Sequence, residues 1–241
     1  TDASAAAPFG AANWRDLGRD PDPTLDAELE ARTAAVVPTD AAFIMYTSGT
    51  TGFPKGVVRN HLFLRNQVDR VRILGTTELD IMYNYLPLFH IFGYLDGPML
   101  SMATGNKQIL VETFDPEACL DAVEAEGVSQ FSGFETHMKG LVEAQKRHAR
   151  DISSLRIGIF GAGTNSAVPI MREGLEVLKP FRPITAYGMT EIGGNACLSF
   201  MDSNDEQICE SSGRPCDGFD FRVIYPDAGQ EQPFDVSGEI V

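Results

Sequence analysis

The chain has 241 residues, of which 43% are apolar and 22% are charged, a composition typical of a globular protein with a substantial core. Its 19 basic and 34 acidic side chains give a formal charge of -15, which argues against binding to nucleic acid or to an anionic membrane surface. No stretch has the apolar length of a membrane-spanning helix, and the alanine-rich start lacks the features of a signal peptide. We therefore expect a cytoplasmic protein with reduced thiols, since no CxxC pair occurs among Cys119, Cys197, Cys209 and Cys216.

The first part of the chain leads into a glycine-rich segment. Residues 1–38 are predicted to be a tail and linker that contains one short helix, which Pro38 ends. The apolar run AAFIMY (41–46) predicts a strand that enters the stretch YTSGTTGFPKG (46–56). A second short strand and a helix follow, so residues 39–80 are expected to form one segment that presents this loop.

Strand-like and helical patterns alternate from residue 81 to 194, and the apolar stretch IFGYLDGPMLSMATG (91–105) predicts one buried helix. The signals for the start and end of a helix are clearest at one place, where Asp115 is an N-cap, Pro116 begins the helix and Gly127 ends it. The alternation predicts an α/β fold with a doubly wound, mostly parallel sheet and helices on both faces. From residue 195 to 241 the strand-like pieces become shorter and predict a small, separate β-rich subdomain. The five predicted strands of the parallel sheet are IMYNYL, KQILVE, VSQFS, LRIGIF and PITAY.

Polar and glycine-rich residues follow four of these strands. The segments LPLFH, GFE, GAGTN and GMTEIGG each lie at the point where a predicted strand ends. Ligands of open α/β sheets bind at the carboxyl ends of the strands. We therefore expect the four segments to line one crevice.

The loop YTSGTTGFPKG has the residues of an anion-binding turn. Ser48, Thr50 and Thr51 supply hydroxyl groups, and the glycines leave backbone N–H groups open to an anion. The spacing fits neither a Walker A loop, which needs GxxxxGK followed by Ser or Thr, nor a GxGxxG dinucleotide motif. A polar surface turn is the alternative interpretation, because the same residue types dominate ordinary loops.

The segment TAYGMTEIGG adds a second set of ligand-binding groups. Tyr187 can stack on a nucleobase, Thr190 can bind a phosphate, and Glu191 can bind Mg²⁺, which prefers carboxylate and phosphate oxygens. A turn with a solvated glutamate is the alternative.

Together, YTSGTTGFPKG and AYGMTE closely resemble signatures of the adenylate-forming superfamily. This superfamily comprises acyl-CoA synthetases, aryl-CoA ligases, luciferases and the adenylation domains of peptide synthetases. The resemblance covers residues from about 40 to 241, and the two motifs occur in the family's order. It implies that ATP activates a carboxylic acid as an acyl adenylate with release of pyrophosphate, and that a thioester with coenzyme A then forms. ATP, Mg²⁺ and coenzyme A as co-substrate are the cofactors that it implies.

The resemblance also assigns roles to individual residues. Lys55, His90, Thr190 and Glu191 match the catalytic positions, with Glu191 as the Mg²⁺ ligand. The acyl pocket is matched by Phe89, His90, Phe134, Gly161, Ile192 and Gly193, with Gly194 beside them. Gly213, Arg214 and Pro215 match a structural turn. The residues that match the family's ATP-binding positions are Thr47, Ser48, Gly49, Thr50, Thr51, Gly52, Lys55, Gly161, Ala162, Gly163, Tyr187, Gly188, Met189 and Thr190.

The family pattern extends beyond this chain at both ends. The family has a longer segment ahead of the phosphate loop, a ribose-binding aspartate beyond the GEI-type stretch, and a catalytic lysine in a C-terminal lid domain. None of these has a counterpart in the 241 residues. We therefore expect a central fragment with little turnover and with exposed apolar surface that favours self-association.

The expected substrate is a fatty or aryl acid rather than an amino acid. Peptide-synthetase domains place an aspartate near the PLFH segment to pair with an amino group, whereas Asp96 lies six residues after His90. Glu135 and Thr136 depart from the apolar pattern of the family, which leaves open a polar acid or an outward-facing helix start.

Three other interpretations fit parts of the same sequence. A peptide-synthetase-type adenylation domain and a non-catalytic domain that binds nucleotide or a protein partner remain alternatives. An unrelated phosphate-binding switch or NTPase is disfavoured, because the loop does not have the Walker A spacing and because the second motif, AYGMTE, is present. Asp96, His137 and His148 are assigned to helix faces rather than to acid–base catalysis.

Overall fold

The computed structural model describes residues 24–49, 52–161, 167–227 and 229–241. The chain divides into two compact units, residues 1–40 and 41–241. In the first unit, helix α1 (Thr24–Ala35) ends shortly before Pro38, as predicted, and has no buried residue. None of the described helices is long and apolar enough to cross a membrane.

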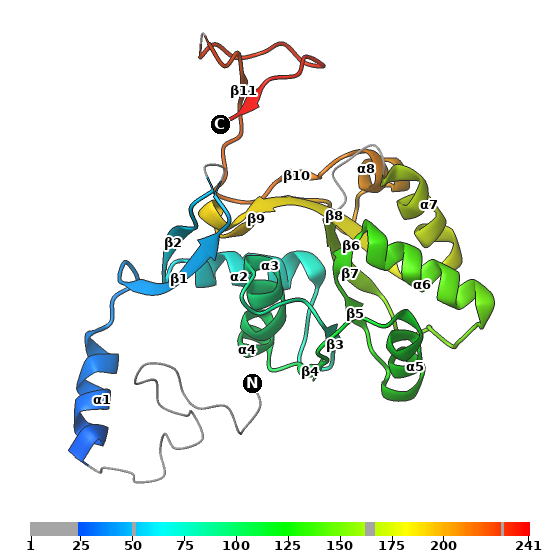
Figure 1. Cartoon of the computed structure of the whole chain (residues 1–241), viewed down its shortest axis with the longest axis horizontal. Coiled ribbons are helices and arrows are strands. Elements are labelled where there is room, and N and C mark those ends of the chain that lie inside the picture. Colours follow the sequence, from blue (N-terminus) through cyan, green and yellow to red (C-terminus); the bar gives the residue numbers. More distant parts are fainter. Residues whose placement is uncertain (1–23, 50–51, 162–166, 228) are drawn as a thin grey trace. The chain divides into compact units, whose positions relative to one another are not determined.

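The second unit is built on a mostly parallel sheet (Figure 1). Five strands run parallel in the order β4, β3, β5, β7 and β8, and the short strand β6 also pairs with β7. The predicted doubly wound, mostly parallel sheet is therefore confirmed. The strand bounds are β3 (Ile81–Asn84), β4 (Lys107–Leu110), β5 (Gln130–Phe131), β6 (Gly133–Phe134), β7 (Ile157–Gly161) and β8 (Arg182–Met189).

The sheet continues past the boundary that the sequence predicted at residue 195. Strand β9 (Gly194–Leu198) runs antiparallel to β8, and β10 (Arg214–Pro215) pairs with β9. The prediction that a separate β-rich subdomain begins at residue 195 is wrong for these strands. Gly193 and Gly194, with φ of +83° and +98°, reverse the chain so that β9 returns along β8. Among the described residues after Pro215, β11 (Val223–Ile224) and β12 (Glu239–Ile240) form a two-stranded sheet separate from the main sheet.

Helices cover both faces of the sheet. Helices α5 to α8 pack on one another in sequence, and α2 packs on α4; Figure 1 shows the two groups on opposite sides of the sheet. Between the layers lies a core of fully buried side chains that includes Leu120, Phe131, Leu141 and Ile157. The helix bounds are α2 (Phe63–Leu74), α3 (Ile91–Tyr94), α4 (Leu100–Thr104), α5 (Pro116–Glu126), α6 (Glu135–Arg147), α7 (Val168–Val177) and α8 (Asp205–Glu210).

Two helical predictions have different outcomes. At α5, the Asp115 carboxylate accepts a hydrogen bond from the Ala118 backbone N–H at 2.8 Å, and Gly127 ends the helix with φ of +72°, as expected. The apolar stretch 91–105 is predicted as one helix, but a π-helical turn, η3 (Leu95–Met99), separates α3 from α4. Pro98 has no N–H to continue the ladder, and Gly97 leaves the helical region with φ of -101° and ψ of -107°.

The glycine-rich loop joins two strands outside the main sheet. Strand β1 (Ala41–Thr47) pairs antiparallel with β2 (Lys55–Asn60), and α2 follows β2. This arrangement confirms the predicted strand on each side of the loop.

All four cysteines are free thiols, and burial raises the pKa of Cys216 to about 11.

Candidate active site

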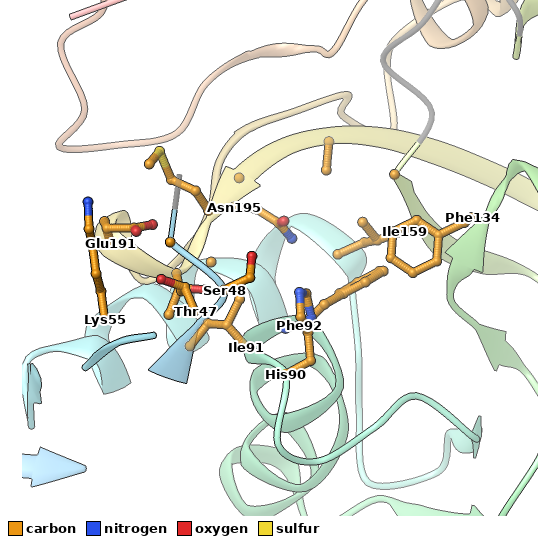
Figure 2. Close-up of a pocket in the computed structure, with 17 residues that line it drawn as sticks. Thr47, Ser48, Lys55, His90, Ile91, Phe92, Phe134, Ile159, Glu191 and Asn195 are labelled. Atoms are coloured by element: carbon orange, nitrogen blue, oxygen red, sulfur yellow. Dashed lines mark hydrogen bonds between the residues drawn. The ribbon is translucent and has the colours of Figure 1, made fainter. Parts of the chain in front are cut away.

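One cavity of about 480 Å³ lies at the carboxyl ends of β7 and β8 (Figure 2). Its walls come from the loop after β1, the start of α3, the β6–β7 edge and the turn between β8 and β9. Segments far apart in the sequence thus meet at the edge where the strand-end argument placed the crevice. The cavity is lined by Thr47, Ser48, Gly49, Lys55, His90, Ile91, Phe92, Phe134, Ile159, Gly161, Ala186, Gly188, Met189, Thr190, Glu191, Gly194 and Asn195.

The loop between β1 and β2 supplies hydroxyl and ammonium groups to the cavity. Thr47 pairs with Lys55 across the two strands, which brings the lysine back beside the residues that open the loop. Gly49 has φ of +64°, and an added Cβ there would lie 2.2 Å from the Phe53 carbonyl oxygen. Glycine is therefore required for the loop to fold back closely enough to place Ser48 and Lys55 on one wall.

The turn between β8 and β9 supplies a hydroxyl and a carboxylate. Thr190 and Glu191 lie on the short 3₁₀ helix η4 (Thr190–Ile192), and both line the cavity. Arg59 of β2 donates from Nη1 to the Glu191 carbonyl oxygen at 2.6 Å. An added Cβ on Gly193 would lie 2.5 Å from Arg59 Nη2, so glycine allows this approach. The arginine fixes the backbone while the Glu191 side chain stays exposed beside Lys55 (Figure 2).

The other end of the cavity is apolar. The rings of Phe92 and Phe134 meet edge to face, with centroids 5.5 Å apart and planes at 81°. Ile159 of β7 lies beside Phe134 in Figure 2. Gly161 lets the ring come close, because an added Cβ would be 2.9 Å from two of its carbons. This end can enclose the hydrocarbon part of a ligand.

His90 stands between the polar and the apolar ends (Figure 2). It is the N-cap of α3, and its Nδ1 accepts a hydrogen bond from the Phe92 backbone N–H at 3.2 Å. Because Nδ1 accepts, a neutral imidazole carries its proton on Nε2. The ring can therefore donate a hydrogen bond to an anionic oxygen in the cavity.

Most of the described residues that the sequence assigned to the site line this cavity. Thr50, Thr51, Ala162 and Gly163 lie outside the described residues. Gly52, Tyr187, Ile192 and Gly193 lie off the lining. The predicted residues that do line the cavity are Thr47, Ser48, Gly49, Lys55, His90, Phe134, Gly161, Gly188, Met189, Thr190, Glu191 and, beside the acyl set, Gly194.

Phe89, which the sequence assigned to the acyl pocket, does not line this cavity, and its acyl-binding role stays a prediction. Its side chain is 83% exposed and lines a separate hollow with Phe43 and Leu88. The backbone turns between Pro87 and His90, with a hydrogen bond of 3.0 Å, so the two neighbours Phe89 and His90 face different hollows.

Two further residues of the predicted acyl pocket are also placed elsewhere. Ile192 lies on η4 but does not line the cavity, and Gly193 packs against Arg59. Tyr187 packs edge to face on Phe221, with centroids 6.2 Å apart. Its role in adenine binding stays a prediction.

Part of the lining was not predicted from the sequence, namely Ile91, Phe92, Ile159, Ala186 and Asn195. A signal existed for Ile159, which lies two residues before Gly161 on the same strand and hence on the same face. The approach of Asn195 has no such signal, because it depends on how the two preceding glycines reverse the chain.

Comparison with known families identifies the chain. The sequence matches the family described as "AMP-binding enzyme" over residues 4–241. The chain belongs to this family. The resemblance to the adenylate-forming superfamily is thereby confirmed.

Named relatives of this AMP-binding chain are CoA ligases. It is 34% identical over 200 residues to a CoA ligase of Mycobacterium tuberculosis named for a methyl-dioxo-octahydroindenyl propanoyl group, covering 83% of this chain and 39% of the relative. It is 32% identical over 178 residues to 2-succinylbenzoate–CoA ligase of Arabidopsis thaliana, covering 72% of this chain and 31% of the relative. The chain thus spans about two fifths or less of the length of these relatives.

Solved structures share the fold. The O-succinylbenzoate coenzyme A synthetase of Bacillus subtilis, in complex with ATP and magnesium ion, matches with a TM-score of 0.73 and 29% identity, covering 85% of this chain and 41% of that protein. ATP-bound MatB of Rhodopseudomonas palustris matches with a TM-score of 0.76 and 25% identity, covering 85% of this chain and 40% of that protein.

Proposed function

We propose that this AMP-binding chain forms the ATP- and acid-binding part of an acid–thiol ligase. In the first step a carboxylate oxygen of the acid attacks the α-phosphorus of ATP, the acyl–phosphate bond forms, and pyrophosphate leaves as the bond to its bridging oxygen breaks. In the second step the sulfur of coenzyme A attacks the acyl carbon and its thiol proton passes to solvent. The thioester forms, and AMP leaves with the carboxylate oxygen that bridged it to the acyl group. One observation carries the proposal: a single cavity joins Lys55, Thr190 and Glu191 to an apolar end, with His90 between them.

The polar end fits a nucleotide triphosphate with magnesium. The Lys55 ammonium and the loop backbone offset the charge of the outer phosphates, and the Thr190 hydroxyl binds the α-phosphate. The exposed Glu191 carboxylate is a hard oxygen ligand of the kind that Mg²⁺ takes alongside phosphate oxygens. When bound, Mg²⁺ neutralises charge on the phosphates and on the leaving pyrophosphate. The ATP and magnesium ion in the related B. subtilis synthetase support this assignment.

The rest of the site positions the acid. His90 donates from Nε2 to a carboxylate oxygen of the substrate and directs the other oxygen toward the α-phosphorus. No side-chain nucleophile is needed, because the reaction joins two substrates that the protein holds in line while it offsets their charge.

The acid is proposed to lack an α-amino group and to have a fatty or aryl body. Asp96 is paired with Arg70 at 3.2 Å, with the two side chains only 3% and 2% exposed, so its carboxylate is not available to a substrate ammonium group. The Phe92, Phe134 and Ile159 wall favours a hydrocarbon body. The acids named for the relatives, a succinylbenzoate and, in the Escherichia coli (strain K12) ligase, a medium-chain fatty acid, support the same class.

Binding of ATP and of non-hydrolysable acyl-sulfamoyl adenosine, a mimic of the acyl adenylate, tests the proposal by calorimetry. We expect Lys55→Met to weaken ATP binding about tenfold or more, because a hydrogen bond to a charged group contributes about 1.5–3 kcal/mol. Glu191→Gln is expected to remove most of the gain in ATP affinity that Mg²⁺ produces. Lys139→Met, the same exchange on the exposed face of α6, is the matched control. Equal hydrolysis of ATP and GTP without any acid would instead favour an unrelated NTPase.

A further inference from the structure

Asn195 places a polar side chain in the apolar end of the cavity. It follows Gly194 at the start of β9 and lines the cavity together with Phe92 and Ile159. Figure 2 shows its amide pointing toward Ile159. A polar atom enclosed by apolar groups is costly unless it forms a hydrogen bond. A ligand that fills this end is therefore expected to offer Asn195 a polar partner.

A buried ion pair lies directly behind Asn195. Arg70 of α2 and Asp96 of η3 meet with Nη1 and Oδ1 3.2 Å apart. With its amide oriented to satisfy both neighbours, Gln67 accepts from Arg70 Nη1 at 2.7 Å and donates to the Leu95 carbonyl oxygen at 2.8 Å. An added Cβ on Gly194 would lie 2.3 Å from Arg70 Nη2, so the turn that carries Asn195 rests on the guanidinium.

The ion pair determines which way the Asn195 amide faces. Burial raises the pKa of Asp96, and the charge of Arg70 and the adjacent Asn195 amide oppose that rise. Because a guanidinium keeps its proton, Asp96 stays ionised as its counter-charge. Asn195 Nδ2 is fully enclosed and has no hydrogen bond of normal geometry to a described residue, whereas a carboxylate repels a carbonyl oxygen. The NH₂ group therefore faces Asp96, and the amide oxygen faces the cavity.

We propose that Asn195 selects an acid whose apolar body carries a hydroxyl group within reach of the amide oxygen. The proposal rests on the function proposed above and names the substrate class more narrowly. A hydroxyl donates a hydrogen bond to the amide oxygen, whereas a keto group would set oxygen against oxygen and an alkyl chain would leave the amide oxygen unpaired. Asp96 and Arg70 are positioning residues, since they act on the substrate only through Asn195.

The test compares acyl-sulfamoyl adenosine mimics that differ in one group. The octanoyl mimic is the reference, and two series carry a hydroxyl or a keto group at each successive carbon of the chain. We expect one hydroxy mimic to bind about tenfold more tightly than the octanoyl mimic, as one satisfied hydrogen bond implies, and its keto counterpart to show no gain. Asn195→Leu, which keeps the side-chain size, should abolish the preference. Asn66→Leu, the same exchange on α2 outside this cavity, should retain it.

Several results would overturn the proposal. A preference for keto mimics, or no preference at all, in the unchanged protein refutes it without any variant. A hydroxyl preference that survives in folded Asn195→Leu refutes the assignment to this residue. Binding of the octanoyl mimic without a hydroxyl gain rejects the role of Asn195 alone and leaves the proposed function standing. Failure of every mimic to bind more tightly than sulfamoyl adenosine rejects both.

For the positioning role, Asp96→Asn is informative because it removes the charge that orients the amide. In this variant the difference in affinity between the hydroxy and the keto mimics should shrink, while the folded fraction of the protein binds the octanoyl mimic with unchanged affinity. An unchanged distinction would exclude Asp96 as the residue that fixes the Asn195 amide.

Discussion

Removal of the Asp96 charge should destabilise the protein far more than removal of a surface carboxylate. The Asp96–Arg70 pair is almost completely buried, and Arg70 Nε and Nη2 have no hydrogen-bond partner among the described residues. Asp96→Asn keeps the shape of the side chain but leaves a buried guanidinium without its counter-charge. Breaking a buried pair in this way costs about 3–5 kcal/mol. For a folded unit of this size, that loss corresponds to a fall in Tm of about 10 °C.

Urea-induced unfolding followed by circular dichroism measures the effect. The matched control is Asp217→Asn, because Asp217 pairs with Arg72 at 2.6 Å but the two side chains are 74% and 67% exposed. An exposed pair contributes at most about 1 kcal/mol. The double variant with Arg70→Met and Asp96→Leu should recover most of the lost stability, because it removes both charges together. If Asp96→Asn cost no more than Asp217→Asn, the account of this pair as a buried, mutually dependent unit would be refuted.

Three further predictions concern stability. Gly194→Ala should lower the free energy of unfolding by more than about 1 kcal/mol, since φ is +98° and the new Cβ would meet the Arg70 guanidinium at 2.3 Å. Gly218 has a similar φ of +88° but open space around it, so Gly218→Ala should lower the free energy of unfolding by less in the same assay. Although burial alone raises the pKa of Asp80, hydrogen bonds led by that from Arg156 hold this pKa below its usual value. The ionised carboxylate therefore adds folding stability above about pH 4, and this stability is lost as the pH falls. Asp80→Asn should flatten the acid limb of a curve of unfolding free energy against pH. Burial lowers the pKa of His137, so the folded state favours the neutral ring and should lose stability below about pH 6.5, a step that His137→Phe should remove.

The sequence carried enough information for most of the sheet and for one end of the site. Local signals such as Asp115, Pro116 and Gly127 act within one helix, so they could be interpreted without knowledge of the rest of the chain. The strand-end rule placed Gly161 and Thr190 at one crevice, because parallel strands end at the same edge.

The features that the sequence did not reveal depend on reversals and long-range pairing. Strand β9 joins the main sheet because two glycines turn the chain back, and no periodicity distinguishes this from the start of a new subdomain. Phe89 and His90 are adjacent in sequence, yet one turn sends them to different hollows. The partner of Asp96 lies 26 positions earlier, at Arg70, and only tertiary packing brings them together.

The contact of Arg59 with the Glu191 backbone has a consequence for engineering this family. Arg59 lies on β2, the strand that follows the glycine-rich loop, and it donates to the Glu191 carbonyl oxygen. It fits there because residue 193 has no side chain. A chimera that imported the loop from a relative but kept the native turn would inherit a mismatch wherever the donor lacked this arginine. Transplanted as a set, the loop, Arg59 and Gly193 would carry their mutual alignment with them. The exchangeable module is thus defined by a contact between positions 132 residues apart in the chain, rather than by any continuous stretch of it.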